Sequence, residues 1–227
     1  MTAFDLASLV LLGAVLGLDV VSFPQAQVSR PLVAATVAGA LMGDALNGLL
    51  LGATLELIAL ETLPVGASRY PEWGSASVVG GALFARIGAQ NPGGMTLAVL
   101  ATLATAWVGG WTMVLLRRLN GIIARRARPA VTRGSRHAVA GVQIFGLSAD
   151  FVRGGLLTIA AFAVFGPVME ASLALWGTDP RISRAVVVGL ATAVAAAAVW
   201  KLFHGTEYAR LLFLGGLVGG LSLLALR

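Results

Sequence analysis

The chain has 227 residues, of which 58% are hydrophobic and 11% are charged. Soluble domains average about 25% charged residues, so this composition excludes an ordinary soluble domain and indicates a polytopic membrane protein. The absence of cysteine excludes disulfides and thiolate metal sites. The net charge is +6, but the arginines are concentrated between apolar segments, so we expect no nucleic-acid partner.

The first apolar segment, residues 3–21, is long enough for one crossing and contains Asp19 near its end. It has no basic region before it and no clear cleavage site after it, so we expect a retained helix rather than a signal peptide. Pro24 and Pro31 then break the helix and predict an irregular connection that carries Gln27. This connection is either a plain interfacial loop or a part of a binding site, since a Gln side chain can both donate and accept hydrogen bonds.

Polar residues interrupt the next apolar stretch, which therefore divides into two short halves, 32–42 and 48–60. Interrupted apolar segments with polar groups form binding sites near the bilayer midplane in many transporters. A carboxylate within such a segment costs roughly 2.5–3.5 kcal/mol on insertion scales, which makes a functional role the default interpretation.

Four residues of this stretch are candidates for a site. Asp44 is suited to capping the second helix, and this structural role competes with a substrate role. Glu56 lies two turns into that helix among apolar neighbours, and capping does not explain it. Thr54 precedes Glu56 by two residues, so the two side chains point about 200° apart on a helix. Glu61, near the helix end, is more simply interpreted as an interfacial carboxylate.

Residues 65–92 are rich in Gly and Ser, and their apolar run is too short to cross a bilayer unaided. We expect a re-entrant hairpin there, because irregular backbone at membrane depth is tolerated only where protein or a water-filled cavity covers it. Tyr70 and Trp73 are interpreted either as residues of an interfacial aromatic belt or as platforms for a sugar ring.

Residues 94–116 form a clear predicted crossing, and a strongly basic stretch, 117–136, follows it. The positive-inside rule places this stretch in the cytoplasm. Apolar residues recur beside the arginines at near-helical spacing, which predicts an amphipathic helix on the membrane face, with docking of an acidic protein as the alternative. The basic residues are Arg117, Arg118, Arg125, Arg126, Arg128, Arg133 and Arg136.

Three further crossings are predicted at 151–169, 182–203 and 209–226. The predicted fold is therefore an all-α polytopic membrane protein, a transmembrane helix bundle with interrupted or re-entrant helices and a cytoplasmic amphipathic helix. We treat residues 1–227 as one domain with a core half (1–116), the basic stretch and a C-terminal part (137–227). No Walker motif and no metal-spaced His/Cys/Asp cluster occurs, so we expect no catalytic residue, cofactor or metal.

The sequence between Gln27 and Gly66 resembles the IIC membrane subunit of the mannose/fructose/sorbose family of the bacterial phosphotransferase system. The likeness rests on "Q-x-x-R-P-L", "G-D" and "G-x-T-L-E-L-x-x-L", which occur here in order and without gaps over about forty residues. They correspond to Gln27–Leu32, Gly43–Asp44 and Gly52–Leu60. Beyond Gly66 the resemblance is one of architecture.

The resemblance implies a permease that binds a hexose-type sugar and moves it across the bacterial inner membrane together with a IID membrane subunit. Soluble IIA and IIB phosphocarriers would phosphorylate the sugar as it emerges, so the chain itself would not be an enzyme. IIC–IID pairs would assemble as a trimer. The substrate-binding residues that it implies are Gln27 and Glu56, with Thr54 and Asp44 as further candidates.

Two other hypotheses remain open from the sequence. One is a non-transporting membrane scaffold or sensor of the same fold that regulates phosphotransferase partners. The other is a stand-alone channel or ion-coupled carrier in which Asp19, Asp44 and Glu56 are cation ligands. The gap-free motif run favours the permease.

Overall fold

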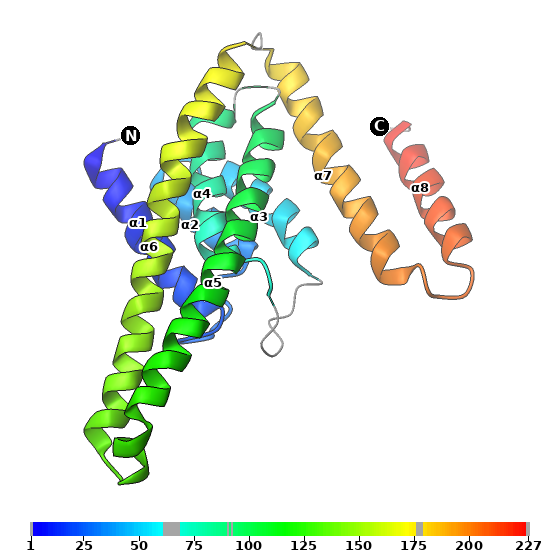
Figure 1. The fold of residues 1–227 in the computed structure, drawn as a ribbon. Coiled ribbons are helices and arrows are strands. Elements are labelled where there is room, and N and C mark those ends of the chain that lie inside the picture. Colours follow the sequence, from blue (N-terminus) through cyan, green and yellow to red (C-terminus); the bar gives the residue numbers. More distant parts are fainter. Residues whose placement is uncertain (1, 61–68, 90, 92, 176–178, 226–227) are drawn as a thin grey trace.

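A computed structural model of the chain describes residues 2–60, 69–89, 91, 93–175 and 179–225, and every regular element among them is helical. This confirms the predicted all-α class (Figure 1). In chain order the elements are α1 (Ala3–Asp19), α2 (Pro31–Leu41), α3 (Ala45–Ala59), α4 (Trp73–Leu83), the π-helix η1 (Phe84–Gly88), α5 (Gly94–Thr132), α6 (Arg136–Ala174), α7 (Pro180–Phe203) and α8 (Ala209–Ala225).

Three helices of the described chain, α5, α6 and α7, are long and apolar enough to cross a membrane. The predicted crossings 94–116 and 151–169 lie within α5 and α6, and the crossing 182–203 matches α7. Both α5 and α6 contain 39 residues, or about 58 Å at 1.5 Å per residue. The two form a long antiparallel hairpin that extends well beyond the other helices (Figure 1).

The basic stretch 117–136 does not form a separate helix. Residues 117–132 continue α5, residues 133–135 form the turn and Arg136 begins α6. The end of the hairpin therefore belongs to two spanning helices, and a separate amphipathic helix on the membrane face is not confirmed. Its place in the cytoplasm stays a prediction.

The short helix α4 fills the centre of the bundle. All residues of α4 are buried, and this helix contacts α1, α2, α3, α5 and α6. Its small side chains permit these contacts: a Cβ on Gly81 would lie 2.5 Å from the Ala35 carbonyl oxygen. The described part of residues 65–92 thus forms one short buried helix that continues into η1, in place of the re-entrant hairpin predicted, and protein covers the backbone of α4.

The connection before α4 is attached to α5. The Arg69 guanidinium lies over the rings of Trp111 and Trp107, at 4.5 and 5.5 Å from their centroids, and the Arg117 guanidinium donates to the Tyr70 hydroxyl. Burial raises the pKa of the Tyr70 phenol, although the Arg117 charge opposes this effect. Tyr70 and Trp73 are both buried, so the interpretation of these two residues as an interfacial belt is wrong.

Helices α2 and α3 form a tight hairpin. Gly43 lies between them at φ +86°, a conformation that favours glycine, and the Asp44 carboxylate caps α3 by accepting from Asn47 N at 3.0 Å. The capping role predicted for Asp44 is confirmed, although α3 begins at Ala45 rather than Gly48. Gly48 permits the close approach of the helices, since its Cβ would lie 2.5 Å from the Ala35 carbonyl oxygen.

The buried Asp19 carboxylate shapes the α1–α2 loop. It accepts from Ala26 N at 2.6 Å, from Ser29 N at 2.9 Å and from the Ser29 hydroxyl at 2.8 Å. Asp19 is only 2% exposed, so these donors replace the water that the carboxylate loses on burial. Gln25 and Gln27, on either side of Ala26, have positive φ values of 60° and 64°. The connection is irregular, as predicted, and the carboxylate holds it in one specific conformation.

Helices α7 and α8 extend to one side of the bundle (Figure 1). Helix α7 contacts α3 and α5, whereas α8 contacts only α7 among the described elements. Helix α8 has 17 residues and is shorter than the roughly 20 residues that a crossing needs, so the last predicted crossing, 209–226, is represented by a short apolar helix.

We expect Gly48→Ala to lower the thermal unfolding temperature of the detergent-solubilised protein by several degrees. The added methyl group would meet the Ala35 carbonyl oxygen, and overpacking of this kind costs about 1–3 kcal/mol. Gly141→Ala is the matched control, because nothing lies within 4 Å of a Cβ at that exposed position of α6. Equal unfolding temperatures for the two variants would contradict the packing of α2 against α3.

We also expect Asp19→Ala to increase the hydrogen–deuterium exchange rates of the Ala26 and Ser29 amides by about fivefold or more, since each lost hydrogen bond is worth about 1 kcal/mol. Exchange is measured by mass spectrometry on peptides that cover residues 20–30. Asp5→Ala removes the capping carboxylate at the opposite end of α1 and should leave this exchange unchanged. Similar exchange in wild type and Asp19→Ala would show that the loop does not depend on the carboxylate.

Candidate functional site

An ion pair joins the beginning of α2 to the last turns of α3. The Arg30 guanidinium contacts the Glu56 carboxylate, with Nε donating to Oε1 at 2.6 Å. The other carboxylate oxygen accepts from the backbone amide of Leu32 at 3.1 Å. This amide lies in the first turn of α2, where the helix dipole stabilises a negative charge. Glu56 thus sits at the positive end of one helix although it belongs to another.

The ion pair is partly exposed rather than buried in the core. The side chains of Arg30 and Glu56 are 26% and 19% exposed. A carboxylate has about four lone-pair sites, and the described donors occupy only some of them. Arg30 was not among the site residues expected from sequence, although it stands in the "R-P-L" motif. The sequence could not reveal its partner, because the two residues are separated by 26 positions.

Gln27 lies at the same end of the α2–α3 hairpin. Its backbone carbonyl oxygen accepts a hydrogen bond from Arg30 N at 3.2 Å. Its side chain is exposed. The Asp19 carboxylate holds Ala26 and Ser29, the residues that flank this position. The fold therefore brings two of the four expected site residues, Gln27 and Glu56, to one end of the hairpin.

The other two expected residues lie elsewhere. Thr54 is 1% exposed, and its hydroxyl donates to the Leu50 carbonyl oxygen of its own helix at 3.0 Å. Asp44 caps α3 at the opposite end of α2, and the 11 residues of α2 separate the two ends by about 16 Å. Asp44 is therefore not placed to share a cation with Asp19 or Glu56, as the ion-carrier hypothesis required.

A second polar group, which sequence reasoning missed as a unit, connects α1, α5 and α6. Asp150 is 1% exposed. Its carboxylate accepts hydrogen bonds from Nε of Arg153 at 2.8 Å and from the Ser22 hydroxyl. Arg153 also donates to Thr112 Oγ1 at 3.3 Å and to the Gly17 carbonyl oxygen at 3.4 Å. Opposite charges three residues apart in an apolar helix could have indicated it.

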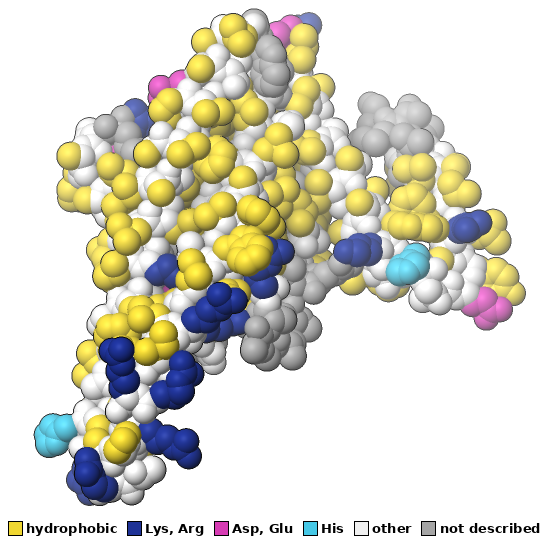
Figure 2. Space-filling model, viewed as in Figure 1, with side chains coloured by type: hydrophobic (Ala, Val, Ile, Leu, Met, Phe, Trp, Pro, Cys, Tyr) yellow, Lys and Arg dark blue, Asp and Glu magenta, His cyan; other side chains and the backbone are white. Residues whose placement is uncertain are grey.

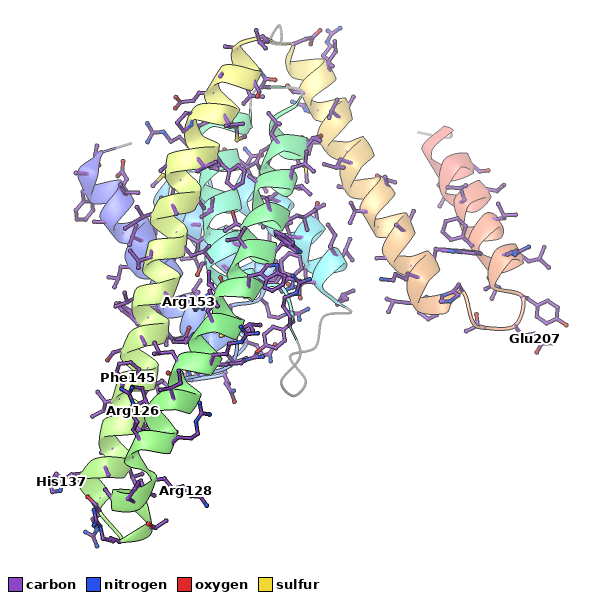
Figure 3. All side chains as sticks on the ribbon, viewed as in Figure 1. Arg126, Arg128, His137, Phe145, Arg153 and Glu207 are labelled. Atoms are coloured by element: carbon purple, nitrogen blue, oxygen red, sulfur yellow. The ribbon has the colours of Figure 1, made fainter. Side chains whose placement is uncertain are left out.

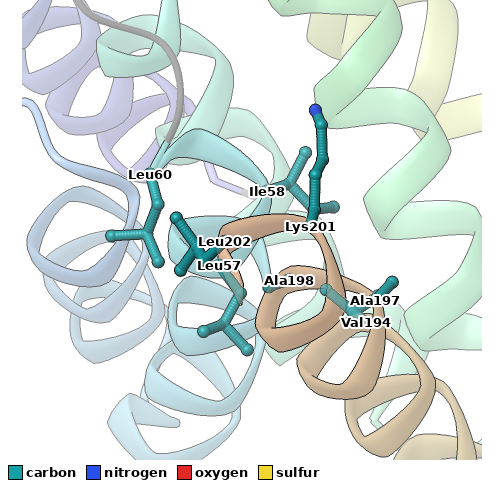
Figure 4. Close-up of a pocket in the computed structure, with 8 residues that line it drawn as sticks. All are labelled: Leu57, Ile58, Leu60, Val194, Ala197, Ala198, Lys201 and Leu202. Carbon is teal, nitrogen blue, oxygen red and sulfur yellow. The ribbon is translucent and has the colours of Figure 1, made fainter. Parts of the chain in front are cut away.

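The described part of the chain contains several cavities, and the side chains that line them are mainly apolar. Figure 4 shows one of about 210 Å³ between α3 and α7, where Leu57 and Ile58 face Ala198 and Lys201. A larger groove of about 620 Å³ runs between α5 and α6 past Val108, Leu156 and Arg153. Apolar walls offer a sugar few of the directed hydrogen bonds that fix a polar ligand. The Gln27, Arg30 and Glu56 side chains offer such bonds.

Metal chemistry finds no support in the described part of the chain, where no three His, Cys, Asp or Glu side chains are grouped so as to hold an ion. The carboxylates of Asp19, Glu56 and Asp150 instead accept hydrogen bonds from nearby backbone and side-chain donors. The arrangement is suited to binding a neutral, hydroxyl-rich molecule, because carboxylate, guanidinium and amide groups together accept and donate.

Comparison with known proteins agrees with this chemistry. The family model described as "PTS system sorbose-specific iic component" matches residues 4–221. The sorbose-specific EIIC component of Klebsiella pneumoniae is 29% identical over 86% of this chain and 72% of its own length. The fructose permease IIC component of Bacillus subtilis is 32% identical over 66% of this chain and 52% of its own. The mannose-specific EIIC component of Escherichia coli is 29% identical over 56% and 46%.

Solved structures show the same fold. One is a cryo-EM structure of the mannose transporter ManYZ in a complex with a microcin, with a TM-score of 0.62 and 19% identity over 97% of this chain and 87% of that one. A second, described only as a membrane protein, has a TM-score of 0.57 and 20% identity over 98% and 96%. The matched segment spans about half the length of the fructose and mannose relatives. With a family match over almost its whole length, the chain belongs to the sorbose-type IIC components of the bacterial phosphotransferase system.

Proposed function

We propose that this chain is the sugar-permease subunit of a phosphoenolpyruvate-dependent phosphotransferase system in a bacterial inner membrane. It binds a hexose-type sugar and carries it across the membrane, and a separate IIB subunit phosphorylates it. The observation that carries the proposal is the Arg30–Glu56 pair, which lies beside Gln27 at one end of the α2–α3 hairpin. The family match makes a sugar the expected ligand.

The sugar contacts Glu56 and Gln27 in this proposal. Sugar hydroxyls donate to the lone pairs of Glu56 that Arg30 and Leu32 leave open, and the Gln27 amide both donates and accepts. Hydrogen bonds to a carboxylate are roughly twice as strong as neutral ones, so a few contacts are enough. Thr54 and Asp44 remain predicted site residues, but their described contacts are structural.

Arg30 balances the charge of this site. A carboxylate alone near the bilayer would be costly to desolvate, and a neutral sugar brings no counter-charge. The guanidinium offsets this cost and keeps the site neutral overall, with or without the sugar. It also presents donors to the ring and hydroxyl oxygens of the substrate.

The proposed partners are a IID membrane subunit and soluble IIA and IIB phosphocarriers, with IIC–IID pairs in a trimer. The most apolar part of α7 is not buried within the described chain, so a membrane partner has room to pack against it. The scaffold hypothesis shares these partners but predicts no sugar flux, so transport assays separate the two.

We expect Glu56→Gln to reduce phosphoenolpyruvate-dependent accumulation of sugar phosphate by about tenfold or more, because a charge-assisted hydrogen bond is worth about 1.5–3 kcal/mol. The assay uses membrane vesicles with coexpressed IID, IIA and IIB proteins and a panel of labelled hexoses. Glu170→Gln removes an exposed carboxylate of α6 and serves as the control. Undiminished flux in Glu56→Gln would exclude this carboxylate from the site, and no flux for any sugar would favour the scaffold.

The proposed orientation places the turn between α5 and α6 in the cytoplasm. The chain lacks cysteine, so single cysteines can report it. We expect a maleimide that does not cross membranes to label Ala140→Cys only from the cytoplasmic side and Ala171→Cys only from the other side. Both residues are exposed and lie near opposite ends of α6. The reverse pattern would overturn the orientation.

A further inference from the structure

The end of the α5–α6 hairpin, residues 117–149, carries the chain's excess positive charge, and we call it the basic arm. It contains seven arginines and no acidic residue, whereas the remaining nine basic residues are outnumbered by the ten acidic residues. Figure 2 shows Lys and Arg side chains gathered on this end, and Figure 3 places Arg126, Arg128 and His137 there, with Arg153 nearer the bundle.

The arm reaches beyond the bilayer. Transmembrane helices tilt by about 20° on average, and at that tilt a helix of about 58 Å rises about 55 Å. The bilayer is about 30 Å thick in its hydrocarbon core and about 40–45 Å with its headgroups. Helix α5 runs on from its apolar part to Thr132, with Pro129 only in its last turn, so we expect the arginines near the turn to lie beyond the headgroups rather than along the membrane face.

The arm also presents apolar surface to that water. A groove of about 450 Å³ lies between its two helices, lined by Ala124, Arg125, Arg128, Val131, Val139 and Val142. Val139 and Ile144 are 51% and 63% exposed in the described structure. An apolar floor beside arginine side chains is typical of a protein-binding surface, where Arg is enriched and apolar anchors fill pockets.

We propose that the basic arm is a docking surface for the acidic face of a soluble protein. Carboxylates or a phosphoryl group of the partner pair with Arg125 and Arg128, whose planar guanidinium groups suit both, and an apolar side chain enters the groove. The inference rests on the proposed function, in which a soluble phosphocarrier must approach the permease. Anionic lipid headgroups offer similar chemistry, but the continuity of α5 and α6 carries the arm away from them.

The test measures the affinity of a IIB protein of a sorbose-type system for the full chain with its IID partner. The complex is held in nanodiscs of neutral phosphatidylcholine. We expect Arg125→Gln with Arg128→Gln to weaken binding by about tenfold or more, since two charge-assisted contacts are lost. Arg181→Gln with Arg184→Gln removes two exposed arginines from the other end of the bundle and should leave the affinity unchanged. Wild-type affinity should fall with added salt.

Three outcomes would overturn the proposal. They are no IIB binding by wild type, equal binding by the Arg125/Arg128 double variant, and binding that requires phosphatidylglycerol in the nanodiscs, which would assign the arm to lipid.

Labelled-sugar binding is measured on the same samples. Sugar binding that is normal in the arm variant but lost in Glu56→Gln separates the docking surface from the sugar site. Wild type that binds IIB but no sugar would refute the proposed function and leave the docking surface standing.

Discussion

The bundle depends on a few buried charged side chains that are paired across its helices. Asp150 and Arg153 are almost fully buried, and removing one partner of such a pair typically costs about 3–5 kcal/mol. Their remaining hydrogen bonds reach Ser22, Thr112 and Gly17, so the pair ties the end of α1 to the long hairpin. Asp19, in that same end, organises the loop that leads to Arg30. The position of Glu56 beside α2 thus follows from a chain of satisfied charges that begins in the hairpin.

Local features of this fold could be predicted from the sequence, whereas its long-range pairings could not. Hydropathy indicated α5, α6 and α7, and the cap at Asp44 followed from its position before an apolar run. The partnership of Arg30 with Glu56 and the burial of Trp73 depend on how distant helices meet. Trp73 looked interfacial because it follows a polar segment, yet α4 packs it into the core. The basic stretch looked like a surface helix because its apolar residues recur at helical spacing. The end of a long helical hairpin has the same spacing, so the pattern does not distinguish the two.

The arrangement separates two tasks in space. In the proposed function, the hairpin of α2 and α3 presents a charge-balanced polar site to a neutral sugar, whereas the apolar cavities, such as the one between α3 and α7, offer it few hydrogen bonds. The basic arm lies along the same α5 and α6 that hold the Asp150–Arg153 pair. The α5–α6 hairpin, which contacts the end of α1, therefore also carries the proposed docking surface.

The central claim is that a sugar binds beside Glu56 and Gln27. A cryo-EM structure of the chain with its IID partner and a bound hexose tests it most directly. We predict sugar density within hydrogen-bonding distance of the Glu56 carboxylate and the Gln27 amide, with the Arg30–Glu56 pair still formed. Sugar density in the groove between α5 and α6, or elsewhere without contact to Glu56, would contradict the claim.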